Sequence, residues 1–375
     1  MAQLYKKWNW KHDLWPHFTY DEEALRGLEL QFSQNTGTVL GILKHVKESE
    51  KEDFLVDILS NEALKTSEIE GEYLDRDSVQ SSIKQNLGLI TDKRKIPPAE
   101  YGISEMMVDL YLHFDKPLTH TQLFEWHRML TNGRRDLVDI GKYRTHKEPM
   151  QVVSGRLDNP NVHFEAPPSN QMLKEMEQFI RWFHNNHFEQ KQELLSIAKA
   201  GMAHLYFVCI HPFEDGNGRI GRAIAEKSIT LSTRKPALIS LSQTIESAKK
   251  EYYNALEMYN TTLDITGWLE YFGKTILQAQ ENTLKQLDFL IEKTKFFDSY
   301  NSLLNERQLR VIQRLFKAGH EGFLGGLSAE NYVRIAKTSS STATRDLVYL
   351  VRQGVFTKTG SLKSTRYFLN IKRNI

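Results

Sequence analysis

Along most of this chain, apolar residues recur with the spacing typical of amphipathic helices. Apolar side chains that recur three and four positions apart, with polar residues between them, give each segment one hydrophobic face. Helices are predicted from residue 21 onward, then at residues 52–70, 100–114, 121–130, from residue 169 onward, and at 193–209, 223–231, 245–260 and 266–290. The pattern predicts a mainly α fold.

The segment 193–209 differs from the other helices because it is apolar on most of its faces. A helix of this kind belongs in the buried centre of a helical bundle. We therefore expect Cys209 to be buried and unreactive, and His204 to be a packed histidine and not a ligand. The helix leads directly to His211, so it gives rigid support to the loop that follows.

Two short segments, residues 150–153 and 162–165, have the alternation of β-strands and are separated by polar and turn-forming residues at 154–161. They predict a β-hairpin in an otherwise helical protein. A hairpin is marginally stable by itself, and its open edge can pair with an extended peptide. A purely structural hairpin is equally compatible with these residues.

The end of the chain has its own charge and its own pattern. Residues 301–375 hold 13 Lys and Arg against 4 Asp and Glu, whereas residues 1–300 hold 36 against 43. Helices at 306–318, 328–337 and 341–352, followed by a strand–turn–strand pattern at 355–369, predict a winged helix. The positive charge favours contact with DNA phosphates. Winged helices also dock proteins, and no base-reading side chains stand out, so DNA and protein contacts both stay open.

Composition adds few constraints. The 375 residues are 40% hydrophobic and 26% charged, which is ordinary for a globular protein. No apolar run has the length of a membrane span, and the first residues lack the apolar region of a signal peptide. The single cysteine excludes an internal disulfide. We expect two or three domains, a cytoplasmic location and no membrane partner.

Side chains suited to binding and catalysis are concentrated in residues 211–222, where a loop leads into the helix predicted next. The residues concerned are His211, Asp215, Gly216, Asn217, Gly218, Arg219 and Arg222. A helix N-terminus attracts anions, and glycines let the backbone approach a phosphate closely. Arginines bind phosphate oxygens in pairs, a carboxylate suits Mg²⁺, and a histidine can act as a base at neutral pH. The window predicts a phosphate-binding site with an adjacent base.

The same window, His-Pro-Phe-Glu-Asp-Gly-Asn-Gly-Arg-Ile-Gly-Arg, matches the Fic motif at every defined position, and the chain resembles the Fic family. Most Fic proteins transfer AMP from ATP to a hydroxyl side chain of a target protein and release pyrophosphate. The resemblance implies that His211 deprotonates a Ser, Thr or Tyr hydroxyl of a target, which could be another copy of the chain itself. It also implies that Asp215 holds Mg²⁺.

The resemblance assigns the remaining motif residues to the phosphates of ATP. Asn217 and the backbone around Gly216 and Gly218 would stabilise the α-phosphate. Arg219 would contact the β-phosphate and Arg222 the γ-phosphate. The hairpin lies where Fic proteins carry the hairpin that aligns the target segment, and this position favours the peptide-pairing interpretation over a purely structural one.

Glu70 stands at the end of the helix predicted at 52–70, just before the helix-stopping residue Gly71. A carboxylate at a helix C-terminus opposes the helix dipole, so it needs a nearby cation or full solvation. The segment Thr66-Ser-Glu-Ile-Glu-Gly71 resembles the inhibitory pattern that precedes the core in one class of Fic proteins. The resemblance implies that Glu70 pairs with Arg222 and excludes the ATP γ-phosphate.

The resemblance divides the chain into an N-terminal extension with the inhibitory helix (1–99), a catalytic core (100–292) and the winged helix (300–375). The expected fold is a Fic-type helical bundle with a small hairpin. Removal of AMP, or transfer of another phosphate-linked group, could use the same site. A nucleotide-sensing DNA-binding regulator is the other alternative, although a pure sensor needs no base at His211. A homodimer that controls inhibition is compatible with the sequence.

Overall fold

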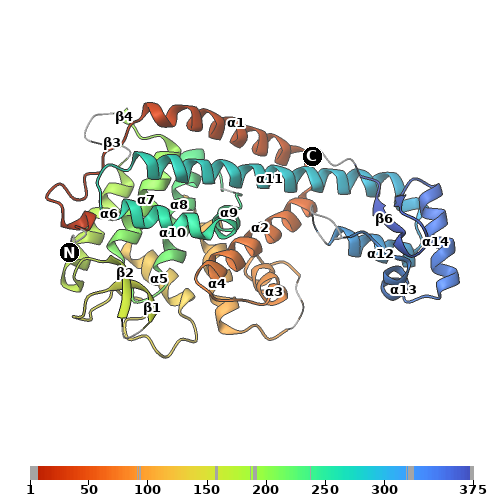
Figure 1. The fold of residues 1–375 in the computed structure, drawn as a ribbon, viewed down its shortest axis with the longest axis horizontal. Coiled ribbons are helices and arrows are strands. Elements are labelled where there is room, and N and C mark those ends of the chain that lie inside the picture. The colour runs from red at the N-terminus through yellow and green to blue at the C-terminus, as the bar shows by residue number, and fades with distance from the viewer. Residues whose placement is uncertain are drawn as a thin grey trace. The chain divides into compact units, whose positions relative to one another are not determined.

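The computed structural model describes residues 7–90, 92, 94–156, 159–185, 187–188, 192–236, 238–317, 319 and 325–371 (Figure 1). The α-helices are α1 (Glu23–His45), α2 (Glu48–Ile69), α3 (Arg76–Asn86), α4 (Pro98–Leu112), α5 (His120–Leu130), α6 (Met172–His184), α7 (Ser196–Ile210), α8 (Asn217–Thr233), α9 (Leu241–Ser247), α10 (Lys249–Tyr259), α11 (Thr266–Tyr300), α12 (Glu306–Phe316), α13 (Ala329–Ala336) and α14 (Ser340–Arg352). The strands are β1 (Gln151–Arg156), β2 (Asn159–Glu165), β3 (His187–Phe188), β4 (Gln192–Glu193), β5 (Phe356–Thr359) and β6 (Arg366–Leu369). The expected mainly α fold is confirmed.

The chain forms two compact units. The first contains residues 1–41 and 51–281, and the second contains residues 42–50 and 282–375. Helix α7 is the centre of the first unit, since nearly all of its side chains are buried in one core, where it packs on α8. The indole of Trp268 on α11 donates to the Gly201 carbonyl of α7 at 2.8 Å. This central helix fixes the start of the loop that carries His211.

Two expectations about α7 are confirmed. Cys209 is buried, and burial raises the pKa of its thiol to about 12, so the thiolate is suppressed. His204 is fully buried, stacks against two aromatic rings of α11 and shares a hydrogen bond with the Tyr252 hydroxyl at 2.7 Å. Both residues therefore belong to the core.

Several predicted boundaries are wrong, and α8 begins at Asn217 and not at residue 223. Helix α7 begins at Ser196 and not at residue 193, because Gln192–Glu193 pairs as a strand with His187–Phe188. The helix expected at 245–260 is two helices, which are separated at Ala248 (φ −126°, ψ 39°) without a proline or glycine to mark the break. Helix α11 continues past residue 290 to Tyr300, since its last apolar residues enter the core of the second unit.

The predicted hairpin is present, with longer strands than expected. β1 and β2 pair antiparallel, and the pairs run from Gln151 with Glu165 to Arg156 with Asn159. Ser154, expected in the connection, is therefore a strand residue opposite Asn161. All of β1 is exposed, so this hairpin offers an accessible strand. Of the connection expected at 154–161, residues 157 and 158 lie outside the described part of the chain.

The second unit contains α12, α13 and α14, followed by the antiparallel pair β5–β6, and Leu327 forms a bridge to Tyr367 of β6. This is the order of elements expected for a winged helix, although residue 318, predicted to end the first helix, lies outside the described residues. Asp346 of α14 is buried. Its carboxylate accepts hydrogen bonds from the Arg307 guanidinium at 2.7 and 2.9 Å and from the Tyr332 hydroxyl at 2.9 Å. One carboxylate thus ties three helices together.

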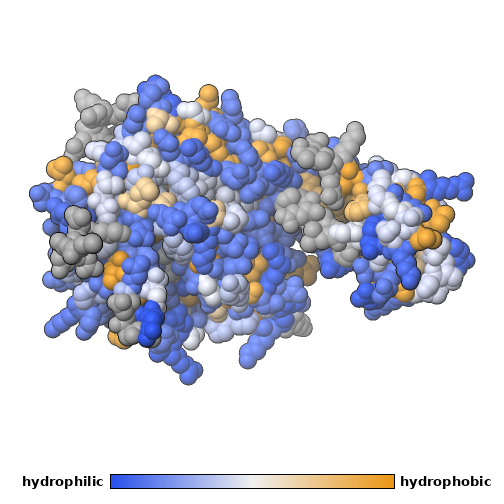
Figure 2. Space-filling view, in the orientation of Figure 1, coloured by the Kyte–Doolittle hydropathy of each residue, from blue (hydrophilic) through white to orange (hydrophobic). Residues whose placement is uncertain are grey.

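Among the described residues, no helix combines the length and the hydrophobicity that a membrane crossing requires. The face seen in Figure 2 is largely hydrophilic, and its apolar residues lie in separate small patches.

Replacing Asp346 by Ala should destabilise the second unit by about 2 kcal/mol, because charged hydrogen bonds are lost and the Tyr332 hydroxyl stays buried. Burial raises the pKa of Asp346, but its bonds to Arg307 and Tyr332 lower it overall, so this stabilisation is present at neutral pH and is lost in acid. Hydrogen exchange of amides in α12–α14 measures the change. Glu330→Ala removes an exposed ion pair with Arg334 and should change nothing measurable. Equal protection in wild type and Asp346→Ala would contradict the role.

Candidate active site

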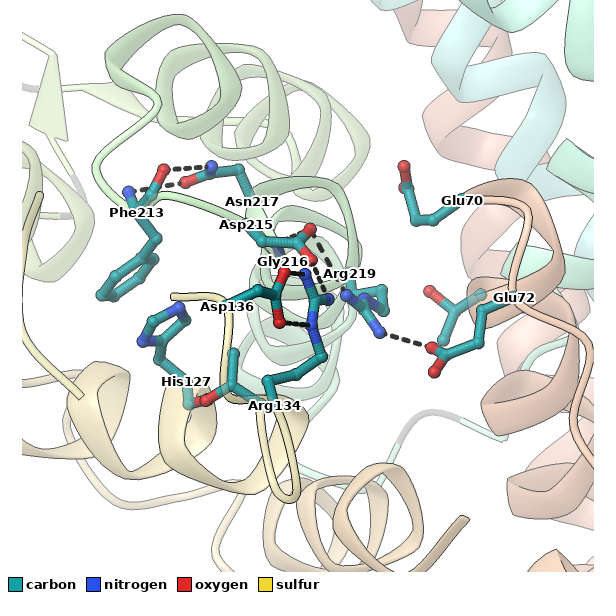
Figure 3. A network of polar contacts seen from close by, with 12 residues as sticks. Glu70, Glu72, His127, Arg134, Asp136, Phe213, Asp215, Gly216, Asn217 and Arg219 are labelled. Atoms are coloured by element: carbon teal, nitrogen blue, oxygen red, sulfur yellow. Dashed lines mark hydrogen bonds and ion pairs between the residues drawn. The ribbon is translucent and has the colours of Figure 1, made fainter. Parts of the chain in front are cut away.

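The end of α2 is shaped by a glycine. Gly71 has φ +84°, and its N–H donates to the Glu68 carbonyl while the N–H of Glu72 donates to the Ser67 carbonyl, which completes a Schellman motif. A residue with a side chain is strained at such a φ, so glycine sets the turn. The turn directs Glu70 and Glu72 toward the N-terminal turn of α8 (Figure 3).

The loop between α7 and α8 is held from inside. The ring of Phe213 is buried and stacks on His127 of α5 with 4.3 Å between ring centroids. Asn217 accepts from the Phe213 N–H at 2.9 Å and donates to the Phe213 carbonyl at 2.8 Å (Figure 3). The Asn217 amide therefore fixes the loop, which leaves the backbone N–H groups at the start of α8 to face an anion.

His211 ends α7 with a left-handed backbone (φ 53°) and lines a cavity. Its Nδ1 lies 3.1 Å from the Val208 carbonyl, which can only accept, so Nδ1 carries the proton and Nε2 has a free lone pair in the neutral ring. Burial, together with a smaller effect of the Arg144 charge, lowers the pKa of His211 to about 4. At neutral pH this side chain is a base ready to accept a proton.

Arg144 holds the backbone of His211. Its guanidinium is buried and donates to the carbonyl of His211 at 2.8 Å and to the carbonyl of Pro167, two residues after β2. The backbone N–H of Arg144 donates to the Pro212 carbonyl at 2.9 Å. The hairpin and the loop after α7 are thereby joined through one side chain.

Arg222 is buried and bonds three groups at the end of α2. Its Nη2 lies 2.7 Å from Glu70 Oε1 and 2.8 Å from the Thr66 carbonyl, and its Nε donates to the Thr66 hydroxyl at 2.8 Å. A carboxylate that opposes its own helix dipole is thus neutralised by a desolvated cation.

Glu70 also covers the N-terminus of α8. A Cβ added at Gly218 would meet Glu70 Oε1 at 2.2 Å, so the carboxylate lies directly against this glycine. The first turn of α8 has no acidic residue of its own. Glu70 therefore stands where a helix N-terminus attracts an anion.

A second set of charges surrounds Asp215 (Figure 3). Arg134, from the turn after α5, lies 2.6 Å from both Asp215 and Asp136. Arg219 lies 2.8 Å from Glu72 and 3.5 Å from Asp215, and its buried Nε has no hydrogen bond within the described residues. Burial raises the pKa of Asp215, but Arg219, Arg134 and the Gly216 N–H lower it overall, so the carboxylate is ionised.

Asp215 fits a metal ion that arrives with a nucleotide, and not one held by the protein alone. In the described chain, no group of three or more His, Cys, Asp or Glu side chains could enclose a metal ion. Mg²⁺ needs only one or two carboxylates when phosphates and waters supply the other ligands. The ionised carboxylate of Asp215 lines the cavity and meets that need once Arg134 gives way.

The site opens into a cavity of about 560 Å³. It is lined by three groups of residues: the motif side (His211, Glu214, Asp215, Gly216, Asn217, Gly218), the hairpin (Val152, Val153, Ser154, His163, Phe164) and α10 (Tyr252, Tyr253, Asn254, Leu256, Glu257), with Glu70 at its edge. The base, the anion site and the hairpin therefore meet around one space.

Sequence reasoning missed several of these residues. Glu72, Arg134, Asp136 and Arg144 were not predicted to take part, nor was the pairing of Ser154 with His163. Glu72 offered a signal, since a second carboxylate two residues after Glu70 could meet a second arginine. The partners of Arg134 and Arg144 are set by tertiary packing, which no local pattern reveals.

Comparison with known proteins identifies the domain. Residues 117–228 match the family model described as Fic/DOC family, and residues 8–89 match a domain of unknown function (DUF4172). The chain therefore contains a Fic domain. Two solved structures share this Fic fold: a Fic family protein from Desulfovibrio desulfuricans G20 (20% identity, TM-score 0.54, 94% of this chain and 98% of that one) and a Fic domain containing signaling protein from Bacteroides thetaiotaomicron VPI-5482 (17%, 0.50, 68% and 97%).

Curated relatives match over a shorter span. Protein adenylyltransferase Fic of Drosophila melanogaster is 28% identical over 167 residues, which are 44% of this chain and 29% of the relative. Protein adenylyltransferase fic-1 of Caenorhabditis briggsae is 27% identical over 152 residues, 40% of this chain and 26% of the relative. The match thus spans less than a third of the length of these relatives.

The His211 environment predicts an unusual titration. The imidazole should titrate near pH 4 in ¹⁵N NMR spectra, well below the usual midpoint of about 6.5, because burial disfavours the charged ring. Glu70→Gln removes a negative charge that favours protonation, so the midpoint should move further down. A midpoint close to 6.5, or an upward shift in Glu70→Gln, would contradict this description of the site.

Proposed function

We propose that this Fic protein is a protein adenylyltransferase that transfers AMP from ATP to a hydroxyl side chain of another protein. The observation that carries the proposal is the meeting of an unprotonated base, His211, with the anion-attracting start of α8 around one cavity. Phosphoryl-type transfer needs mainly positioning and charge neutralisation, and this arrangement supplies both.

Each residue of the motif has one role in this reaction. The target hydroxyl gives its proton to Nε2 of His211 while its oxygen attacks the α-phosphorus of ATP, and pyrophosphate leaves. The N–H groups at Gly216–Gly218 stabilise charge on the α-phosphate, while Arg219 and Arg222 bind the β- and γ-phosphates. Asn217 and Phe213 keep the loop in place. Mg²⁺ bound with ATP would neutralise phosphate charge, and Asp215 would hold it.

Glu70 acts as an inhibitor in this proposal. Its carboxylate lies against Gly218 and pairs with Arg222, so it competes with the γ-phosphate for Arg222. Glu72 extends the competition to Arg219. ATP that binds without displacing these carboxylates would lack the contacts that orient its phosphates.

The hairpin provides the means to present a target. All of β1 is exposed, and the hairpin lines the cavity that holds His211. An extended peptide can add to such a strand through main-chain hydrogen bonds, which brings its side chains toward the base. Removal of AMP from a target, or transfer of another phosphate-linked group, would use the same groups, and the mass of the modified target separates these reactions.

In the decisive test, the chain is incubated with a lysate, Mg²⁺ and ATP labelled in the α-phosphate. Label on lysate proteins should rise about tenfold or more in Glu70→Gly, since each tenfold change corresponds to about 1.4 kcal/mol of lost competition. His211→Ala should lower it by about 100-fold or more, because a general base contributes at least that factor.

The matched control is Glu68→Gly, which removes a carboxylate of the same helix turn that pairs with Lys65 and not with the motif arginines. It should leave the labelling at the wild-type level. Labelling by His211→Ala at the wild-type level would refute the proposed base. Absence of label with the wild type, Glu70→Gly and His211→Ala alike would refute adenylyl transfer.

A second function is favoured by the second unit: we propose that α14 contacts DNA phosphates. The exposed positions of α14 are Ser340, Ser341, Thr344, Arg345, Val348, Tyr349 and Arg352. Within this fully described helix the one acidic residue, Asp346, is turned inward to Arg307. The exposed face is therefore free of acids, and exposed Lys358 and Lys363 of the following hairpin region add positive charge.

Binding of the full chain to a fluorescent random-sequence DNA duplex tests this second proposal. Arg345→Ala with Arg352→Ala should weaken binding and lower the slope of log affinity against log salt by about 2, about one for each lost phosphate contact. Arg334→Ala, on α13 and paired with Glu330, is the charge-matched control for one arginine. Equal affinity and slope in the double variant would exclude this face, and absence of binding by the wild type would favour protein docking.

A further inference from the structure

A chain of hydrogen bonds connects the hairpin to α10. Ser154 Oγ of β1 lies 2.6 Å from Nε2 of His163 on β2, and Nδ1 of the same ring lies 2.9 Å from Oε2 of Glu257 on α10. All three residues line the cavity that also contains His211 and Gly216–Gly218. None of the three belongs to the motif at residues 211–222.

The direction of these hydrogen bonds follows from their chemistry. An ionised carboxylate can only accept, so Nδ1 of His163 donates to Glu257. In the neutral imidazole the other nitrogen, Nε2, then accepts, and the Ser154 hydroxyl donates to it. This is the order of a nucleophile, a base and an orienting carboxylate, in which the hydroxyl proton points at the base.

The position of Ser154 gives this order a use. Ser154 is exposed, whereas His163 and Glu257 are half-buried, so the hydroxyl is the accessible end of the chain. It stands on the strand that we assign to target presentation, and it faces the cavity assigned to ATP. The Ser154 hydroxyl therefore shares one cavity with His211 and with the start of α8.

We propose that Ser154 is an internal acceptor of the AMP group, with His163 as its own base and Glu257 as the residue that orients His163. This inference rests on the adenylyltransferase function proposed above and names one hydroxyl substrate of the same cavity. It makes the hairpin a site of covalent modification as well as a site of peptide pairing.

The step balances without any further reactant. The bond from Ser154 Oγ to the α-phosphorus of ATP forms, and the bond from that phosphorus to the oxygen that bridges to the β-phosphate breaks. Pyrophosphate leaves with the bonding electron pair. The hydroxyl proton passes to Nε2 of His163, and the Glu257 carboxylate stabilises the resulting imidazolium. The product is a phosphodiester between AMP and Ser154.

The test uses the full chain carrying Glu70→Gly, incubated with a lysate, Mg²⁺ and α-labelled ATP. Tandem mass spectrometry should find one adenylyl group on Ser154, in the peptide that spans β1 and β2. Adding Ser154→Ala should remove it from the hairpin, and Ser154→Thr, which keeps a hydroxyl, should retain it. His163→Gln should lower the initial rate of Ser154 labelling by about 100-fold, the factor typical of a general base. His146→Gln changes a partly exposed histidine whose ring bonds the Glu148 carbonyl, away from the Ser154–His163–Glu257 chain, and should leave the rate unchanged.

The outcomes separate the two proposals. Label on lysate proteins with none on Ser154 overturns the internal acceptor and leaves adenylyl transfer intact. No label on any protein overturns both. Label on Ser154 at an equal rate in His163→Gln overturns the base role and reduces the three residues to a tether between the hairpin and α10.

Discussion

The contact between Glu70 and Arg222 is the interaction on which the rest of the site depends. Arg222 is a buried cation, and a buried charge is costly unless it is paired. Glu70 supplies that pair at 2.7 Å and also lies against Gly218 at the start of α8. The same two groups are the ones that a nucleotide phosphate would seek. Stability of the folded chain and access to the site are therefore opposed, since in the proposed function ATP would first have to displace Glu70, a partner that the fold already provides.

Local patterns in the sequence were sufficient for most of the helices, for the hairpin and for the loop after α7, but not for α3. The apolar character of residues 196–210 requires burial, and Gly71 and Gly216 mark turns that need a positive φ. What could not be predicted is set by packing between distant segments. Arg134 meets Asp215 from 81 residues away, and Arg144 reaches the carbonyl of His211 from 67 residues away. Breaks such as the one at Ala248 carry no residue signal and depend on the neighbouring helices.

The core of the first unit and the chemistry of the cavity are linked through few side chains. Phe213 anchors the loop in the core, Asn217 joins its two ends, and Arg144 connects it to the residues after the hairpin. Each of these contacts is made to backbone atoms or to an aromatic ring. The loop can therefore keep its shape while the charged side chains around it exchange partners, as the proposed inhibition by Glu70 would require.

The two ion-pair systems around the loop differ in their contact with solvent. The Arg222 side chain is 2% exposed, whereas Arg134 and Asp136 are 40% and 63% exposed. Dissolved ions screen exposed charges over about 8 Å at physiological ionic strength and act far less on buried pairs. Ionic strength should therefore loosen the Arg134 side of the loop, next to Asp215, while the Arg222 side stays closed. If Asp215 holds Mg²⁺ as proposed, the salt concentration would change how readily the ion reaches Asp215. It would have far less effect on the pair of Glu70 and Arg222.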